Sequence, residues 1–202
     1  MAGASFQPYC DKTMLSDSDF VTLNAIYLKK MAIAQTIADV NGLPLEVVGE
    51  RLAAALDAGW IMELPTGAML LTEGIEHVLA YYRETYAVVR TEPALLKWYE
   101  GFEVLNGRFI GMVTEWQKTE GDERVERRLL QAAGKLAKDI GQLVPQIPRY
   151  AAYVRRFEHS MDRVDQGQRD FVCKPTLDSV HNIWFEFHED MLAVLGRPRD
   201  TT

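Results

Sequence analysis

The chain has 202 residues, of which 48% are apolar and 25% are charged. This composition is typical of a globular protein of one large or two small domains and excludes a disordered or fibrous chain. No apolar run approaches the ~20 residues that a membrane-spanning helix needs, and the first residues lack the basic-then-apolar order of a secretion signal. Cys10 and Cys173 lie far apart without a CxxC pattern, so we expect free thiols and a cytoplasmic protein that contacts no membrane.

The net charge of −7 is unevenly distributed along the chain. Residues 1–92 carry 6 Lys and Arg against 12 Asp and Glu, whereas the rest of the chain carries 16 against 17. The acidic surplus therefore lies almost entirely in the N-terminal part, where it disfavours contact with an anionic partner.

The N-terminal part predicts three helices followed by a hairpin. Helix-capping residues at 16–19 precede an amphipathic segment, and Asn41-Gly42 supplies the left-handed turn that ends a second, short helix. Pro44 suits the first position of a third helix, because its missing N–H would be unpaired there. In chain order we expect helices at 20–32, 34–40 and 44–59, strands at 60–64 and 68–72 around a turn at 65–67, and a long helix at 73–89.

This order of elements resembles the winged helix of MarR-like bacterial regulators. The residues that carry the resemblance are apolar positions of the second and third helices, the turn between them and the end of the third helix: Ile33, Ile37, Asn41-Gly42-Leu43, Val48, Leu52, Ala55 and Leu56-Asp57-Ala58-Gly59-Trp60. The resemblance covers Ser18 to Tyr82 and implies a winged-helix domain at 18–92. Because one fold hosts many functions, the function has to be argued from the surface residues.

Thr91-Glu92-Pro93 is the expected boundary between this domain and the rest of the chain. Beyond it, apolar residues recur at helical spacing in four segments, which predicts a four-helix bundle at 93–199. The predicted fold class is therefore mainly α, with an N-terminal winged helix-turn-helix followed by an α-helical bundle. The apolar stripes of the four segments begin at Leu95, Val125, Tyr150 and Leu177 and are expected to form the bundle core.

The predicted third helix is poorly suited to DNA. In a helix-turn-helix protein this helix enters the major groove while nearby cations neutralise phosphates. The groove-facing residues would be Leu45, Glu46, Gly49 and Glu50. One glutamate can accept a hydrogen bond from cytosine, but two would meet the phosphates with like charge. The hairpin tip at 64–69 also lacks Lys and Arg, so the sequence argues against DNA binding.

The last helical segment holds a candidate ligand strip. His181, Phe185 and His188 share one face beside Trp184, and such an apolar wall with polar groups suits a phenolic or anionic ligand in a groove of the bundle. The alternative is that these histidines are polar residues that flank the core. His181 and His188 would lie ~10 Å apart along the helix, too far to share one metal ion. We predict no metal site and no cofactor.

Three arginines of the third bundle segment form a second candidate site. Arg149, Arg156 and Arg163 recur every seven residues. One interpretation is a solvated face, on which the carboxylates at 158, 162 and 165 pair with them. The other is a stripe that binds an anion or an acidic partner.

The chain contains no GxSxG, GxxxxGK[ST] or GxGxxG motif, so we expect that it catalyses no reaction by itself. The segments 95–117, 150–164 and 174–199 resemble small proteins that accompany phosphoenolpyruvate-synthase-like phosphotransferases, and the longest phrase that carries this resemblance is DSVHNIWFEFHEDML at 178–192. In that group the nucleotide-binding and phosphohistidine parts of the enzyme sit on other chains.

The two resemblances imply two functions. The first is a non-catalytic accessory or substrate-presenting subunit, which contacts phosphotransferase subunits or a second copy of itself. The alternative is a MarR-like winged-helix transcription regulator that senses a small, aromatic ligand. The acidic third helix favours the first function, whereas the usual use of the N-terminal fold favours the second.

Overall fold

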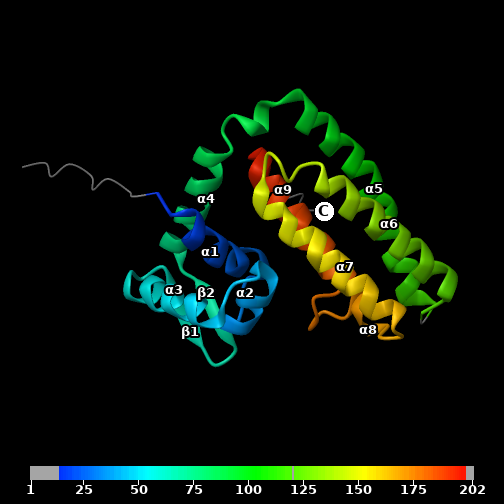
Figure 1. The fold of residues 1–202 in the computed structure, drawn as a ribbon, viewed down its shortest axis with the longest axis horizontal. Helices are drawn as coiled ribbons and strands as arrows, with labels where there is room; N and C mark the ends of the chain where they lie inside the picture. The colour runs from blue at the N-terminus through cyan, green and yellow to red at the C-terminus, as the bar shows by residue number, and fades with distance from the viewer. Residues whose placement is uncertain (1–13, 120, 199–202) are drawn as a thin grey trace, which may run out of the picture.

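The computed structural model describes residues 14–119 and 121–198, and it is mainly helical, as the sequence predicts (Figure 1). Figure 1 shows the N-terminal elements, in blue to cyan, on one side and the long helices α5, α6 and α7 on the other. Helix α9 contacts helices of both groups. In chain order the elements are α1 (Asp17–Lys29), α2 (Ala34–Asn41), α3 (Leu45–Asp57), β1 (Ile61–Leu64), β2 (Gly67–Leu70), α4 (Thr72–Thr85), η1 (Val89–Thr91), α5 (Pro93–Lys118), α6 (Glu123–Gly141), η2 (Pro148–Tyr150), α7 (Ala151–Asp165), α8 (Asp170–Cys173) and α9 (Val180–Leu195).

Local caps explain the bounds of the first helices. Helix α1 begins three residues earlier than predicted, because the Ser16 side chain accepts a hydrogen bond from the backbone N–H of Asp19. Helix α2 ends as predicted at Gly42, whose φ of 66° is the left-handed conformation that favours glycine. Pro44 immediately precedes α3.

The hairpin is tighter than predicted. Strands β1 and β2 pair antiparallel with Leu64 opposite Gly67, so only Pro65 and Thr66 form the turn. Backbone hydrogen bonds between Ala32 and Ala68 attach β2 to the segment between α1 and α2. The hairpin is thereby fixed against the first two helices.

Helix α4 ends at Thr85 and not at Val89 as predicted. The Arg90 guanidinium donates hydrogen bonds to the carbonyl oxygens of Tyr82 and Tyr86, which also accept from the backbone N–H groups of Tyr86 and Arg90, so Arg90 ties η1 to the end of α4. The β-branched Val88 and Val89 also have low helix propensity. The chain therefore turns through η1 before α5 starts.

The four predicted bundle segments form α5, α6, α7 and α9, and α6 packs against both α5 and α7. The short helix α8 lies between α7 and α9, in the connection between the third and fourth predicted segments. Helix α9 starts at Val180 and not at Leu177, because Ser179 caps it and the Asn182 amide donates to three carbonyl oxygens of residues 174–177. The preceding residues are thus held as an irregular segment.

The buried apolar residues of the N-terminal elements and of the bundle form one hydrophobic cluster, which includes Phe20, Tyr82, Phe157 and Phe187. The predicted boundary at residues 92 and 93 coincides with the step from η1 to α5, and the independence of the two domains stays a prediction. No helix in the described ranges 14–119 and 121–198 is long and apolar enough to cross a membrane.

Candidate functional site

A groove of about 890 Å³ lies between the N-terminal elements and the bundle. One wall comes from the end of α1 and from α2, and the other comes from α7, α8, α9 and the segment before α9. The groove is therefore built where the two parts of the chain meet. Its lining residues are Leu28, Lys29, Lys30, Met31, Thr36, Asp39, Val40, Arg155, Arg156, His159, Phe171, Pro175, Thr176, Leu177, Asp178, Asn182, Phe185 and Glu186.

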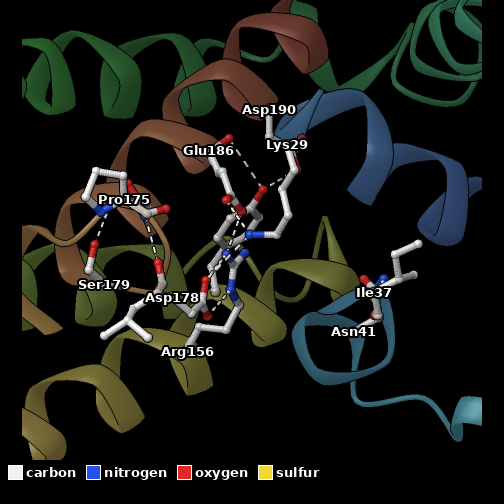
Figure 2. A network of polar contacts seen from close by, with 12 residues as sticks. Lys29, Ile37, Asn41, Arg156, Pro175, Asp178, Ser179, Glu186 and Asp190 are labelled. Atoms are coloured by element: carbon white, nitrogen blue, oxygen red, sulfur yellow. Dashed lines mark hydrogen bonds and ion pairs between the residues drawn. The ribbon is translucent and has the colours of Figure 1, made fainter. Parts of the chain in front are cut away.

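Four charged side chains form a network in this groove (Figure 2). Lys29 Nζ of α1 lies 2.5 Å from Glu186 Oε1 of α9 and 3.7 Å from Asp178 Oδ1. Arg156 of α7 donates from Nε to Asp178 Oδ2 at 2.8 Å and from Nη2 to Asp178 Oδ1 at 2.6 Å. The same Nη2 donates to Glu186 Oε2 at 2.5 Å. Two cations therefore face two carboxylates from four parts of the fold.

The local charges keep Asp178 and Arg156 ionised. Burial acts to raise the pKa of Asp178, but the hydrogen bonds and charges of Arg156 and Lys29 outweigh burial, and the pKa lies below its ordinary value. Burial also acts to lower the pKa of Arg156, and the carboxylates of Glu186 and Asp178 reverse that effect. Asp178 and Arg156 are both charged at neutral pH.

The walls beside the network are partly apolar. Phe185 of α9 has 42% of its surface exposed, although it is a large aromatic residue next to the core. Phe171 and Leu177 line the same groove. Apolar surface next to fixed charges is the usual composition of a small-molecule site.

A second ionic network lies deeper. Arg149, just before α7, donates two hydrogen bonds to the fully buried carboxylate of Asp190 in α9. The hydroxyl of Tyr153 donates to Asp190 at 2.9 Å, and Asp190 Oδ1 and Asn24 Oδ1 share the single O–H of Tyr82, at 2.9 and 2.7 Å. These contacts join α1, α4, α7 and α9 and satisfy the buried carboxylate from several sides.

The four residues of the predicted ligand strip are placed in different surroundings. Phe185 lines the groove, whereas Trp184 is buried, stacks on Phe109 at 3.7 Å and donates to Asn106 Oδ1. His188 Nε2 lies 3.1 Å from Glu103 Oε1, beside Tyr99. Burial lowers the pKa of His181, so its imidazole is neutral at neutral pH. Trp184, His181 and His188 do not line the groove with Phe185. A ligand role for these three residues stays a prediction.

The three arginines of the predicted stripe also differ. The solvated-face interpretation is wrong for Arg149 and Arg156, because both are largely buried and paired with carboxylates of α9 and its preceding segment. Arg163 packs on the Phe171 ring at 5.4 Å. Among these three, only Arg156 lines the groove, and their role toward an anion or a partner stays a prediction.

The residues that would face DNA lie on one exposed surface of α3. Leu45, Glu46, Gly49 and Glu50 are all exposed. This placement leaves two carboxylates on the surface that would approach a phosphate backbone. No group of His, Cys, Asp and Glu that could hold a metal ion occurs in the described part of the chain.

Sequence reasoning missed Lys29, Asp178 and Glu186. A signal for the two networks was present, because Glu186 and Asp190 lie four residues apart within the apolar stripe of α9. Charged residues in such a stripe need buried partners. Arg149 and Arg156, two helical turns apart on the neighbouring segment, have the spacing to provide them.

A scan of the sequence against protein-family models, a search of curated proteins and a search of solved structures each found no match.

Proposed function

We propose that the protein is a non-catalytic, substrate-presenting subunit that holds a small molecule in the groove between the N-terminal elements and the bundle. The observation that carries the proposal is the groove itself, a space of about 890 Å³ with apolar walls and a charged network. This volume lies in the range of small-molecule sites. The groove is partly open to solvent, so in this proposal a bound molecule keeps part of its surface accessible to another chain.

The partner in this proposal is a phosphoenolpyruvate-synthase-like phosphotransferase. The resemblance of the segments 95–117, 150–164 and 174–199 to proteins that accompany such enzymes supports this choice. Helix α3 supplies a surface for the contact, because its exposed Glu46 and Glu50 suit a basic patch on a protein. The chemistry would be carried by the partner, and this chain would position the acceptor molecule.

The test is a reconstitution with the chains of a phosphoenolpyruvate-synthase-like phosphotransferase. Phosphoryl transfer should depend on adding this chain, and Phe185→Ala should lower turnover while the melting temperature stays near that of the wild type. Val104→Ala is the matched control, because Val104 is exposed on α5 away from the groove. Transfer at an equal rate without this chain, or failure to associate with such a partner, would remove the proposal.

A MarR-like transcription regulator is the second candidate. It is favoured by one observation, the order α1–α2–α3–β1–β2–α4 with the start of α3 exposed. The same surface disfavours it, because a recognition helix with two free carboxylates and one nearby arginine repels phosphates.

Duplex-DNA binding distinguishes the two candidates. We expect weak binding without sequence preference, and Glu46→Lys with Glu50→Lys should strengthen it by adding phosphate contacts. A specific site bound at ~10⁻⁸ M or tighter in physiological salt, the range of specific regulators, would favour the regulator instead.

A further inference from the structure

Asp178 differs from the other three members of the groove network. Its side chain is 32% exposed, whereas those of Lys29, Arg156 and Glu186 are 15%, 8% and 9% exposed. It also lies on the irregular segment between α8 and α9, while the others belong to long helices. Asp178 is thus the carboxylate of the network that solvent reaches most easily.

The contact of Asp178 with Arg156 has the geometry of anion recognition. Both carboxylate oxygens accept from the guanidinium, at 2.6 and 2.8 Å, and Lys29 Nζ stands 3.7 Å away. A planar guanidinium fork binds carboxylates and phosphates in this two-point manner. The buried Glu186 balances only one of the two cations, so a second anion is required at the position that Asp178 occupies.

We propose that the groove binds an organic anion with an apolar body, and that its carboxylate or phosphate group replaces Asp178 on Arg156 and Lys29. This inference rests on the proposed function, because it names the class of molecule that the groove holds. The apolar body lies against Phe171, Leu177 and Phe185, which line the same groove.

The replacement requires only that the Asp178 side chain rotates into solvent. The backbone of its segment stays in place, because the Asn182 amide holds the carbonyl oxygens of Lys174, Pro175 and Leu177 at 2.7–3.2 Å. Asp178 therefore acts as an internal competitor, which fills the anion position when no ligand is present and lowers the apparent affinity of the ligand.

The test is a fluorescence titration with two aromatic probes. One is 8-anilinonaphthalene-1-sulfonate, an anion, and the other is N-phenyl-1-naphthylamine, which has the same aromatic body without the sulfonate. Asp178→Ala should bind the anionic probe about tenfold more tightly than the wild type, because the competing carboxylate is gone. Its affinity for the neutral probe should be unchanged, and Asp178→Glu should behave like the wild type.

Asp170→Ala is the matched control, because it removes an exposed aspartate of the neighbouring α8 that pairs with Lys174 and does not line the groove. It should change the affinity for neither probe. Lys29→Gln, made in the otherwise wild-type chain, should weaken binding of the anionic probe alone and tests the site even if Asp178→Ala does not fold. Equal gains for both probes in Asp178→Ala would indicate a loosened fold and would overturn the proposal, as would no gain.

Competition identifies the anionic group. Benzoate and inorganic phosphate are each added to Asp178→Ala loaded with the anionic probe, and displacement by one of them assigns the carboxylate or the phosphate. Displacement by neither would contradict the anion site. These measurements use this chain alone, so a negative result would not contradict the association with a phosphotransferase. Conversely, absence of that association would not contradict the anion site.

Discussion

At the scale of single residues, the unusual feature is the number of charges that the fold buries around α9. Asp190 is fully buried and Glu186 nearly so, and taking each out of water costs several kcal/mol. Arg149 and Arg156 offset that cost through direct hydrogen bonds, with tyrosine hydroxyls supplying the remaining donors to Asp190. Such pairs add little net stability when intact. Removal of one partner, however, strongly destabilises the fold, because the other charge stays buried without a counter-ion.

Asp190→Asn should therefore lower the free energy of unfolding by about 3–5 kcal/mol, because Arg149 would keep a buried charge without its counter-ion. Urea denaturation of the variant and of the wild type measures the difference. Lys135→Gln is the control, since it breaks an exposed pair with Asp139 one helical turn away, and it should cost about 1 kcal/mol or less. Similar losses in the two variants would contradict the buried-network argument.

At the scale of helices, the replacement of glycine by alanine is expected to have opposite effects on stability at two positions. Gly42 ends α2 with a positive φ, and a Cβ there would lie 2.9 Å from the Arg155 guanidinium. Gly49 lies inside α3 with an exposed surface and open space where a Cβ would point. The same substitution should thus act in opposite directions at the two positions.

We expect Gly42→Ala to destabilise the protein by about 1–2 kcal/mol, the cost of a left-handed conformation for an L-residue. Gly49→Ala should stabilise it by about 0.5–1 kcal/mol, because alanine loses less backbone entropy in a helix. Thermal unfolding followed by circular dichroism gives both values. Unchanged or higher stability of Gly42→Ala would show that the turn does not need glycine, and lower stability of Gly49→Ala would contradict the helix-propensity argument.

At the scale of the whole molecule, the N-terminal elements and the bundle are joined by more than the chain. They share one hydrophobic cluster, and both ionic networks cross between them. Lys29 reaches Glu186 in α9, and Tyr82 of α4 donates to Asp190 in the same helix. Both parts also contribute lining residues to the groove.

A fragment that starts at Pro93 should remain helical but unfold at a lower temperature and less cooperatively than the full chain. The reason is that Asp190 loses the Tyr82 hydroxyl and Glu186 loses Lys29, and buried carboxylates without their partners are destabilising. Circular dichroism and calorimetry of fragment and full chain measure this. An unfolded fragment would contradict the predicted boundary, and a melting temperature equal to that of the full chain would contradict the coupling.

The sequence by itself determined the class of the fold and most of its helices. Apolar spacing, the capping serine at 16 and the turn at Asn41-Gly42 act within a few residues of themselves, so local physics is sufficient to place α1, α2 and the bundle segments. Only Phe185 and Arg156 of the predicted site residues line the groove. A tryptophan suits a core as well as a pocket wall, and only the folded chain shows that Trp184 is buried, stacked on Phe109 and hydrogen-bonded to Asn106.

The tertiary structure decided which charges meet. Lys29 and Glu186 are 157 residues apart, and nothing in their neighbouring residues indicates that they pair. A charged side chain on a helix has several candidate partners, and the choice among them depends on how helices from the two parts of the chain pack. The groove, its anion position and the deep Arg149–Asp190 pair arise from that packing, because each is built by side chains that only the folded chain brings within hydrogen-bonding distance.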